Sequence, residues 1–233
     1  YFIRIVKRCH HSFFNTLREK MMLGADSPDV AFVISLAGVG VDGLQILKLQ
    51  NDAILRTTPG MTPERVDQFM SLFNTLFDKV HAVPLDEPLD VPLRQAFDQW
   101  VAQQDEATLK AVNFNDGRDE MFFSRYLRQA QGRWYREMIS YDPEDYIPRI
   151  HQPVLALNGD KDIMVPAKEN LASIKQLLDK GGNTRYKIVE LPGLNHMFQR
   201  CKDCTREEIP DLEDVFSEEA LQIMGDWLRE NIK

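Results

Sequence analysis

The chain has 233 residues and a formal net charge of -8, from 28 basic and 36 acidic side chains. Its length suits one large domain or a core with a subdomain, and 43% hydrophobic residues can supply the core. General nucleic-acid binding needs a surplus of lysine and arginine to neutralise phosphates, so the acidic balance argues against a nucleic-acid partner. No apolar run reaches the roughly 20 residues of a membrane helix, which predicts a soluble chain without a transmembrane segment.

The first residues lack the charge-then-apolar order of a signal peptide. The sequence begins without methionine and directly in an apolar run, so we expect the native protein, with any targeting signal, to start upstream. The compartment is therefore left open. Cys9, Cys201 and Cys204 are an odd number of cysteines, which predicts no disulfide framework.

In chain order, we first predict a strand over residues 1–6 and a helix over residues 15–23. Residues 29–37 form a continuous apolar run rich in β-branched side chains, typical of a strand covered on both faces in a parallel sheet. Glycines follow closely and predict a loop after this strand.

Residues 44–142 have helical patterns only. Thr62 is a predicted N-cap followed by Pro63, and apolar residues then recur at helical spacing as far as Val80. Shorter apolar stripes predict further helices over residues 93–101, 121–127 and 134–139. Such an insert between parallel strands is typical of a lid, so we predict an α/β core from residues 1–43 and 143–233 with a helical cap over residues 44–142.

Strands and helices then alternate. We predict a strand over residues 154–157, a helix over 166–180 that ends at Gly181, a strand over 185–191, and a final helix capped by Ser217. The apolar residues expected on one face of this last helix are Leu221, Met224, Trp227 and Leu228. This order predicts the α/β class, with a parallel sheet and flanking helices.

Two candidate functional residues, Asp162 and His196, each follow a predicted strand. In open parallel sheets, functional groups collect in the loops at the carboxyl ends of the strands. A carboxylate there can hold an imidazole in one tautomer, while the imidazole takes and returns a proton from a nucleophile. Alone, such an aspartate is most often a turn former and such a histidine a surface loop residue. Their positions after successive strands favour a catalytic pair.

The residues around this pair resemble those of a known superfamily. The stretch Val-Leu-Ala-Leu-Asn-Gly-Asp-Lys-Asp-Ile-Met-Val-Pro over residues 154–166 and Leu-Pro-Gly-Leu-Asn-His-Met-Phe over 191–198 resemble the acid and histidine turns of α/β-hydrolases. The strand over 32–38 and the segment 133–143 extend the resemblance, which is closest to cap-bearing serine esterases and covers residues 27–233.

The resemblance implies a triad in the order serine, acid and histidine, with the serine on a G-x-S-x-G elbow. It implies Asp162 as the acid and His196 as the base, and Asp160 is the nearest competitor for the acid. Residues 1–31 contain no G-x-S-x-G. Ser12 follows a histidine at a matching distance, but bulky Phe13 and Phe14 stand where the elbow needs small residues, so Ser12 is a weak candidate.

The earlier strands and the loop that supplies an oxyanion-hole donor are absent as well. We therefore interpret the chain as the C-terminal portion of such a hydrolase, or as a product whose first two dozen residues differ from the family sequence.

The leading functional prediction is a carboxylic-ester hydrolase that acts on a small-molecule ester through an acyl-enzyme, with no metal or organic cofactor. The alternatives are a catalytically inactive hydrolase-like binding module or fragment, and a serine peptidase acting on small peptides. The spacing of His196, Cys201 and Cys204 also permits a zinc site, but no fourth ligand lies nearby in the sequence. Otherwise the two cysteines are reduced or paired with each other. Acyl length, alcohol group and oligomeric state are left open.

Overall fold

A computed structural model describes residues 23–27, 29–205, 207–213 and 215–232. The chain divides into two compact units. The first, which we call the α/β unit, contains the residues up to Val41 and those from Asp142 onward, and the second, the helical unit, comprises Asp42–Tyr141. The strand and helix predicted over the first 22 residues lie outside the described residues, as does Ser12.

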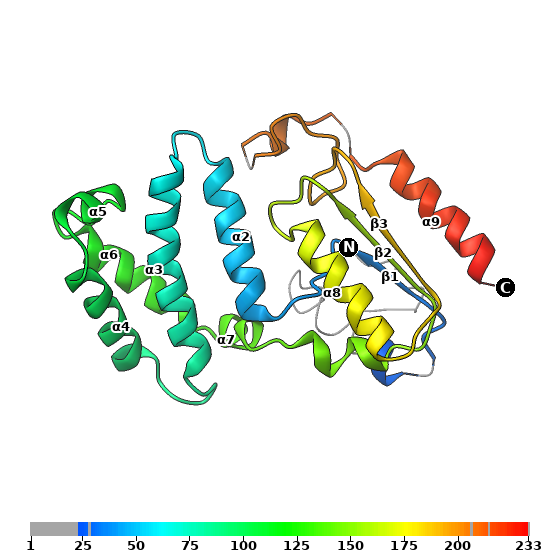
Figure 1. Ribbon diagram of the computed structural model, residues 1–233, viewed down its shortest axis with the longest axis horizontal. Helices are drawn as coiled ribbons and strands as arrows, with labels where there is room; N and C mark the ends of the chain where they lie inside the picture. Colours follow the sequence, from blue (N-terminus) through cyan, green and yellow to red (C-terminus); the bar gives the residue numbers. More distant parts are fainter. Residues whose placement is uncertain (1–22, 28, 206, 214, 233) are drawn as a thin grey trace. The chain divides into compact units, whose positions relative to one another are not determined.

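The α/β unit is built on a sheet in which the described strands are all parallel and lie in the order β1-β2-β3 (Figure 1). The strands are β1 (Val33–Leu36), β2 (Val154–Gly159) and β3 (Tyr186–Leu191). In the register, Val33 lies opposite Val154, which in turn lies opposite Tyr186. The predicted α/β class with a parallel sheet is therefore confirmed.

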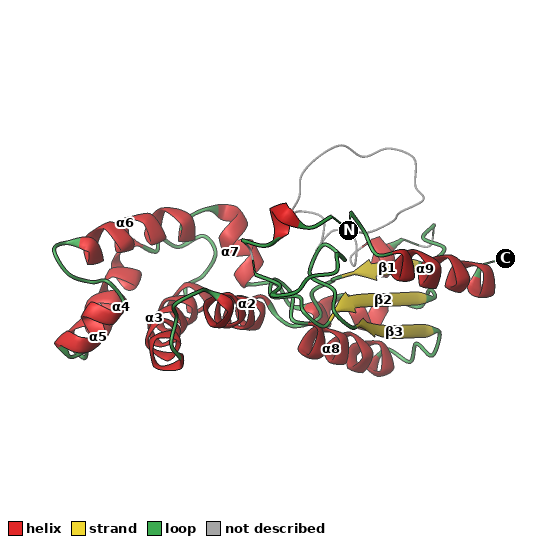
Figure 2. Cartoon of the chain, turned by 90° about the horizontal axis from the view of Figure 1, so that it is seen from above, coloured by secondary structure: helices red, strands yellow, loops and turns green. Residues whose placement is uncertain are grey.

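Alternating side chains on each strand face two separate cores. Val33, Val154 and Ala156 pack with the inner residues of helix α8 (Ala167–Lys180). Ile34 and Leu155 belong to the core that includes helix α9 (Glu218–Asn231). The two helices therefore cover opposite faces of the sheet (Figure 2). This double coverage explains the continuous apolar runs of β1 and β2, because residues of both parities are buried.

Short elements connect these pieces. The 3-10 helices η1 (Pro143–Asp145) and η2 (Ile147–Arg149) precede β2, and η3 (Ile209–Asp211) precedes α9. Helix α8 ends at Gly181 as predicted. A Cβ on Gly181 would lie 2.0 Å from the carbonyl oxygen of Pro148, so only glycine lets the end of α8 approach η2 so closely.

Helix α9 differs from the prediction in one residue of its buried face. Ser217 caps the helix as predicted, because its hydroxyl accepts a hydrogen bond from the Ala220 N–H at 3.3 Å. Ala220, Met224 and Trp227 are buried, whereas Leu221 is 53% exposed. The prediction that Leu221 faces inward is wrong, since the small Ala220 takes the inner position in the first turn of the helix.

The helical unit contains six described helices: α2 (Gly43–Thr57), α3 (Pro63–Ala82), α4 (Asp90–Ala102), α5 (Glu106–Ala111), α6 (Arg118–Ala130) and α7 (Arg133–Ile139). Helix α3 packs against both α2 and α4. Thr62 caps α3 and Pro63 opens it, as predicted. The core of the unit is rich in aromatic rings, and the buried Phe97 packs in tilted geometry on Phe114 and Phe123, with centroids 5.6 Å and 5.0 Å away.

The two ends of the helical unit are joined by hydrogen bonding. The Gly43 N–H donates to the carbonyl oxygen of Tyr141 at 2.8 Å. A Cβ on Gly43 would lie 1.9 Å from the carbonyl oxygen of Met138, so glycine is required for this approach. Nearby, the buried Arg136 donates to the carbonyl oxygens of Val83 and Glu87 and so ties α7 to the α3–α4 loop.

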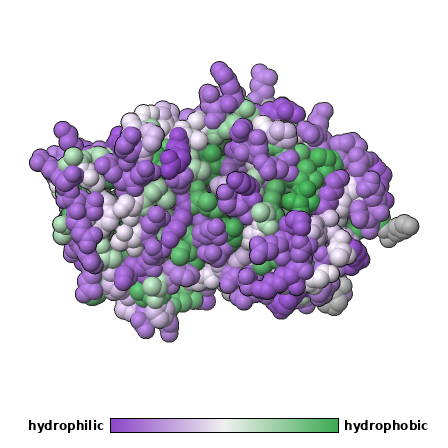
Figure 3. Space-filling model, in the orientation of Figure 1, coloured by the Kyte–Doolittle hydropathy of each residue, from purple (hydrophilic) through white to green (hydrophobic). Residues whose placement is uncertain are grey.

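The molecular surface is mostly hydrophilic on the face that Figure 3 shows. Large exposed apolar side chains are dispersed over both units, such as Val91 and Met121 in the helical unit and Val215 in the α/β unit. Dispersed apolar side chains are normal for a protein surface. Within the described ranges, no helix is both long and apolar enough to cross a bilayer.

Candidate active site

Asp162 lies in the turn that follows β2 and is held by three donors. Its Oδ1 accepts the N–H groups of Met164 and Val165, each at 2.8 Å. Its Oδ2 lies 2.8 Å from Nδ1 of His196. The Asp162 side chain is fully buried. A buried carboxylate needs such hydrogen-bond donors, and here they fix the orientation of both its oxygens.

Asn158 holds the same turn from the last part of β2. Its Nδ2 donates to the Val165 carbonyl oxygen at 2.7 Å, so the Val165 residue is fixed through both its N–H and its carbonyl group. Asn158 is fully buried, and its Oδ1 has no hydrogen-bond partner in the part of the chain that the structure describes. Asn158 is therefore a positioning residue for the Asp162 turn.

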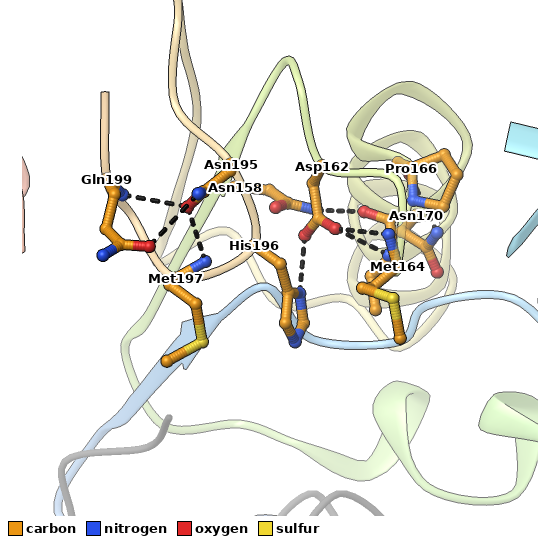
Figure 4. A network of polar contacts seen from close by, with 10 residues as sticks. Asn158, Asp162, Met164, Pro166, Asn170, Asn195, His196, Met197 and Gln199 are labelled. Atoms are coloured by element: carbon orange, nitrogen blue, oxygen red, sulfur yellow. Dashed lines mark hydrogen bonds and ion pairs between the residues drawn. The ribbon is translucent and has the colours of Figure 1, made fainter. Parts of the chain in front are cut away.

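His196 lies in the turn after β3 and points its two ring nitrogens in different directions (Figure 4). Since the Asp162 oxygen can only accept, Nδ1 carries the hydrogen in this pair. In the neutral ring, Nε2 then has a lone pair for a proton. Figure 4 shows Nε2 turned away from Asp162, with Met164 and Met197 extending in the same direction. The His196 side chain is 36% exposed.

The histidine turn is held internally by Asn195. The buried Asn195 side chain accepts the N–H groups of Met197 at 2.9 Å and Gln199 at 3.0 Å. Phe198 anchors the turn, because its ring is buried and stacks on Phe216 with centroids 5.2 Å apart. Its φ of 59° is uncommon for a non-glycine residue.

Gly159 brings the two turns together. A Cβ on Gly159 would lie 2.1 Å from the carbonyl oxygen of Leu194, so the backbone of the histidine turn rests directly on the end of β2. The Lys161 N–H donates to that same carbonyl oxygen at 3.1 Å. The spacing between Asp162 and His196 therefore depends on the missing side chain of Gly159.

Asp160 and Asp162 have separate tasks. Oδ1 of Asp160 accepts the Gly193 N–H at 2.6 Å and so holds the Pro-Gly turn, in which Gly193 has a φ of 75°. Asp162 is the aspartate that binds His196. The geometry thus distinguishes the two acidic residues that the sequence presents as competitors.

Sequence patterns identify Asp162 and His196, and the structure brings them into contact. They do not identify Asn158 or Asn195, whose side chains bind backbone groups of their own turns, or Gly159, whose role depends on the distant Leu194. The predicted nucleophile candidate, Ser12, lies outside the described residues. Among the residues that are described, no hydroxyl group is hydrogen-bonded to His196.

The two late cysteines are bonded to each other, with a sequence separation of 3. Of the two states left open for these cysteines, reduced or paired with each other, the structure has the paired one. Their sulfurs are consumed in the bond and are not thiolate ligands. Across the described ranges, no group of three or more potential metal ligands is found.

A scan against protein-family models returns no match, and a search of curated protein sequences returns none either. Solved structures do match. A Mycobacterium tuberculosis chain described as a non-heme bromoperoxidase is 14% identical with a TM-score of 0.35, and the match covers 91% of this chain and 63% of that one. A second Mycobacterium tuberculosis protein, Rv0554, is 13% identical with a TM-score of 0.37, with 91% and 62% covered.

An esterase structure is 14% identical with a TM-score of 0.34, and the match covers 77% of this chain and 53% of the esterase. These neighbours are α/β-hydrolase-fold proteins. The chain spans less than two thirds of the length of each of them. With TM-scores below 0.5, the likeness carries no conclusion about activity.

Proposed function

We propose that this chain belongs to a serine hydrolase of the α/β-hydrolase type that cleaves small carboxylic esters through an acyl-enzyme. The observation that carries the proposal is the buried Asp162 carboxylate bonded to Nδ1 of His196, whose Nε2 is turned outward. A carboxylate in this position holds the imidazole in one tautomer and stabilises the imidazolium that forms when Nε2 takes a proton.

The proposed reaction has two stages. Nε2 of His196 takes the proton of a serine hydroxyl while the oxygen attacks the ester carbonyl, and the imidazolium then returns the proton to the leaving alcohol. Water, activated by the same nitrogen, releases the acid from the acyl-enzyme. The half-buried Met164 and Met197, whose side chains extend in the same direction as this nitrogen in Figure 4, provide flexible apolar surface that suits an acyl or alcohol group.

The helical unit is proposed to act as the cap of this site. The support is topological: the chain leaves the α/β unit just beyond the carboxyl end of β1 and returns before β2. The acid and histidine turns follow the carboxyl ends of β2 and β3, which lie at the same edge of a parallel sheet.

A fluorophosphonate probe, which reacts with activated serines, tests the proposal. We expect labelling of the folded chain that is lost in His196→Ala and retained in His151→Ala, a matched change at an exposed histidine. Mapping the adduct tests Ser12 directly. Folded protein that takes no label would refute serine hydrolysis by this chain.

The second candidate is a hydrolase-like binding module without catalysis. It is favoured by the absence of a G-x-S-x-G motif from the sequence, together with the lack of a described hydroxyl on His196. If the probe fails, saturable binding of a p-nitrophenyl ester without turnover supports this module. If the probe labels, the rates on p-nitrophenyl esters and aminoacyl anilides separate an esterase from a peptidase.

A further inference from the structure

Cys201 and Cys204 form a disulfide within the motif Cys-Lys-Asp-Cys, which begins five positions after His196. Two cysteines separated by two residues are the spacing of many thiol–disulfide exchange sites. This ring is very short, so it restricts the unfolded chain less than a long-range disulfide does. Its effects are therefore expected near the bond and not across the whole molecule.

The loop that carries the pair is held by Glu208 independently of the sulfurs. The Glu208 carboxylate accepts the backbone N–H groups of Lys202 at 2.7 Å, Asp203 at 2.9 Å and Cys204. These hydrogen bonds, that of Lys202 foremost, lower the pKa of Glu208 from its ordinary value. The charged carboxylate can thus keep the loop backbone in place whether the sulfurs are bonded or free.

The two sulfur-bearing residues differ in accessibility. Cys201 is half-buried, whereas Cys204 is buried with 7% of its surface exposed. An attacking thiolate therefore reaches Cys201 first, and Cys204 is the leaving group. This asymmetry is what a directional exchange reaction requires, because attack at one sulfur releases the other.

The backbone of Cys201 also closes the base of the hairpin that carries His196. The Cys201 N–H donates to the Gly193 carbonyl oxygen at 3.2 Å, and the Gly193 N–H donates to Asp160 at 2.6 Å. An antiparallel bridge joins Leu194 to Arg200 between these ends. The disulfide thus begins at a residue whose backbone bonds to Gly193, and Gly193 in turn binds the acid turn through Asp160.

We propose that Cys201 and Cys204 are a thiol–disulfide exchange site for a dithiol reductant, and that their redox state sets how firmly the His196 turn is held. A thiolate of the reductant attacks Sγ of Cys201 and forms a mixed disulfide, while Sγ of Cys204 leaves as a thiolate and takes a proton. The second thiol of the reductant then displaces Cys201, which is protonated in turn. The disulfide gains two electrons and the dithiol is oxidised to a disulfide.

Exchange is tested in a Cys9→Ser background, so that only this pair can react. We expect dithiothreitol to reduce the pair in the folded chain, with both cysteines alkylated in peptide mass spectra and the sheet amides still protected. A pair that resists reduction until the chain is denatured overturns the proposal. The test reads sulfur chemistry only, so it stands apart from the hydrolase hypothesis.

Single variants test the direction of attack. In the same background, Cys204→Ser leaves the half-buried Cys201 and Cys201→Ser leaves the buried Cys204. We expect the first variant to react with a small-molecule disulfide, and so to form a mixed disulfide, about tenfold faster than the second. The reason is that exposure controls access to the sulfur. Equal rates, or the reverse order, contradict the assigned direction.

Hydrogen exchange tests the coupling to His196. On reduction we expect the amides of residues 193–201 to exchange about tenfold faster, while those of β1 and β2 stay unchanged. The double variant Cys201→Ser/Cys204→Ser should match the reduced chain and be insensitive to dithiothreitol. Equal exchange in the oxidised and reduced chains overturns the coupling.

Discussion

Both units contain a histidine whose Nδ1 meets an oxygen, and the two differ in what that oxygen is. In the helical unit, Nδ1 of His81 lies 3.1 Å from the Ile139 carbonyl oxygen, a neutral acceptor that ties α3 to α7. In the α/β unit, Nδ1 of His196 meets the fully buried carboxylate of Asp162. A carboxylate can stabilise an imidazolium far better than a carbonyl can, so only the second contact prepares a ring for proton transfer.

The same contrast extends to other buried polar groups. Arg136 donates hydrogen bonds to carbonyl oxygens of the helical unit. The hydroxyl groups of Tyr126 and Tyr135 lie 3.3 Å apart and face each other. These groups satisfy one another within the core. In the α/β unit, the turns of Asp162 and His196 instead leave an outward nitrogen with unused bonding capacity. A ring nitrogen with an unused lone pair beside a buried carboxylate distinguishes a candidate active site from a core whose polar groups all bond to one another.

The largest expected effect comes from Asp162→Asn. The new amide can donate to Nδ1 of His196 and favour the tautomer with its hydrogen on Nε2, where the base needs a lone pair. If the proposed hydrolase is right, kcat/KM on a p-nitrophenyl ester falls by about 10⁴-fold. Asp226→Asn, an exposed change on α9, serves as the control. A loss of less than about tenfold would show that the carboxylate has no catalytic role.

A smaller effect is expected from Gly159→Ala, which puts a methyl group where the Leu194 carbonyl oxygen now lies. The histidine turn must move, so we expect a loss of about 3 kcal/mol in the free energy of unfolding, measured with urea. The matched change Gly225→Ala lies within α9 and has room, with the nearest atom 3.7 Å from the new Cβ. It should stabilise by about 0.5 to 1 kcal/mol. Equal effects at the two glycines would contradict the close approach.

The stability of the helical unit should depend on pH in the alkaline range. Burial raises the pKa of Tyr135 from 10.0 to about 12, and burial followed by the proximity of Tyr135 raises that of Tyr126 as well. Because these tyrosines ionise at a lower pH in the unfolded chain than in the folded one, the free energy of unfolding keeps its full value below pH 10. It decreases as the pH rises towards 12. For Tyr135 alone this loss is about 3 kcal/mol.

Urea unfolding followed by circular dichroism, repeated from pH 9 to 12, measures this loss. The double variant Tyr126→Phe/Tyr135→Phe removes both phenol groups and should flatten the pH dependence over that range. A slope that persists in the double variant would place the titrating groups elsewhere.

Sequence reasoning predicts the parts of this molecule that depend on neighbours in the chain. Caps such as Thr62 and Ser217 and the buried strands follow from local chemistry, and the order of strands predicts that the turns of Asp162 and His196 share one edge. Contacts between distant residues are not predictable in this way. The need for glycine at position 159 arises from Leu194, which belongs to the other turn. The role of Asn158 is local, but it depends on a side-chain bond to Val165 that no helix or strand pattern reveals.

The errors have the same origin. Leu221 is apolar and at helical spacing, yet the exact rotation of α9 on the sheet leaves it exposed. The bounds of α2 were not predicted either, although Asp42 caps it.

The hydrogen bond between Gly43 and Tyr141 has a consequence for how the chain folds. β1 and β2 pair through Val33 and Val154, which are 154 − 33 = 121 positions apart. Closing such a loop from a disordered chain costs about 4 kcal/mol in entropy and slows folding. Once the helical unit has folded, this bond holds its first and last residues together. The two ends of the long loop are then already close together. Early folding of the helical unit would therefore lower the entropy cost of pairing β1 with β2.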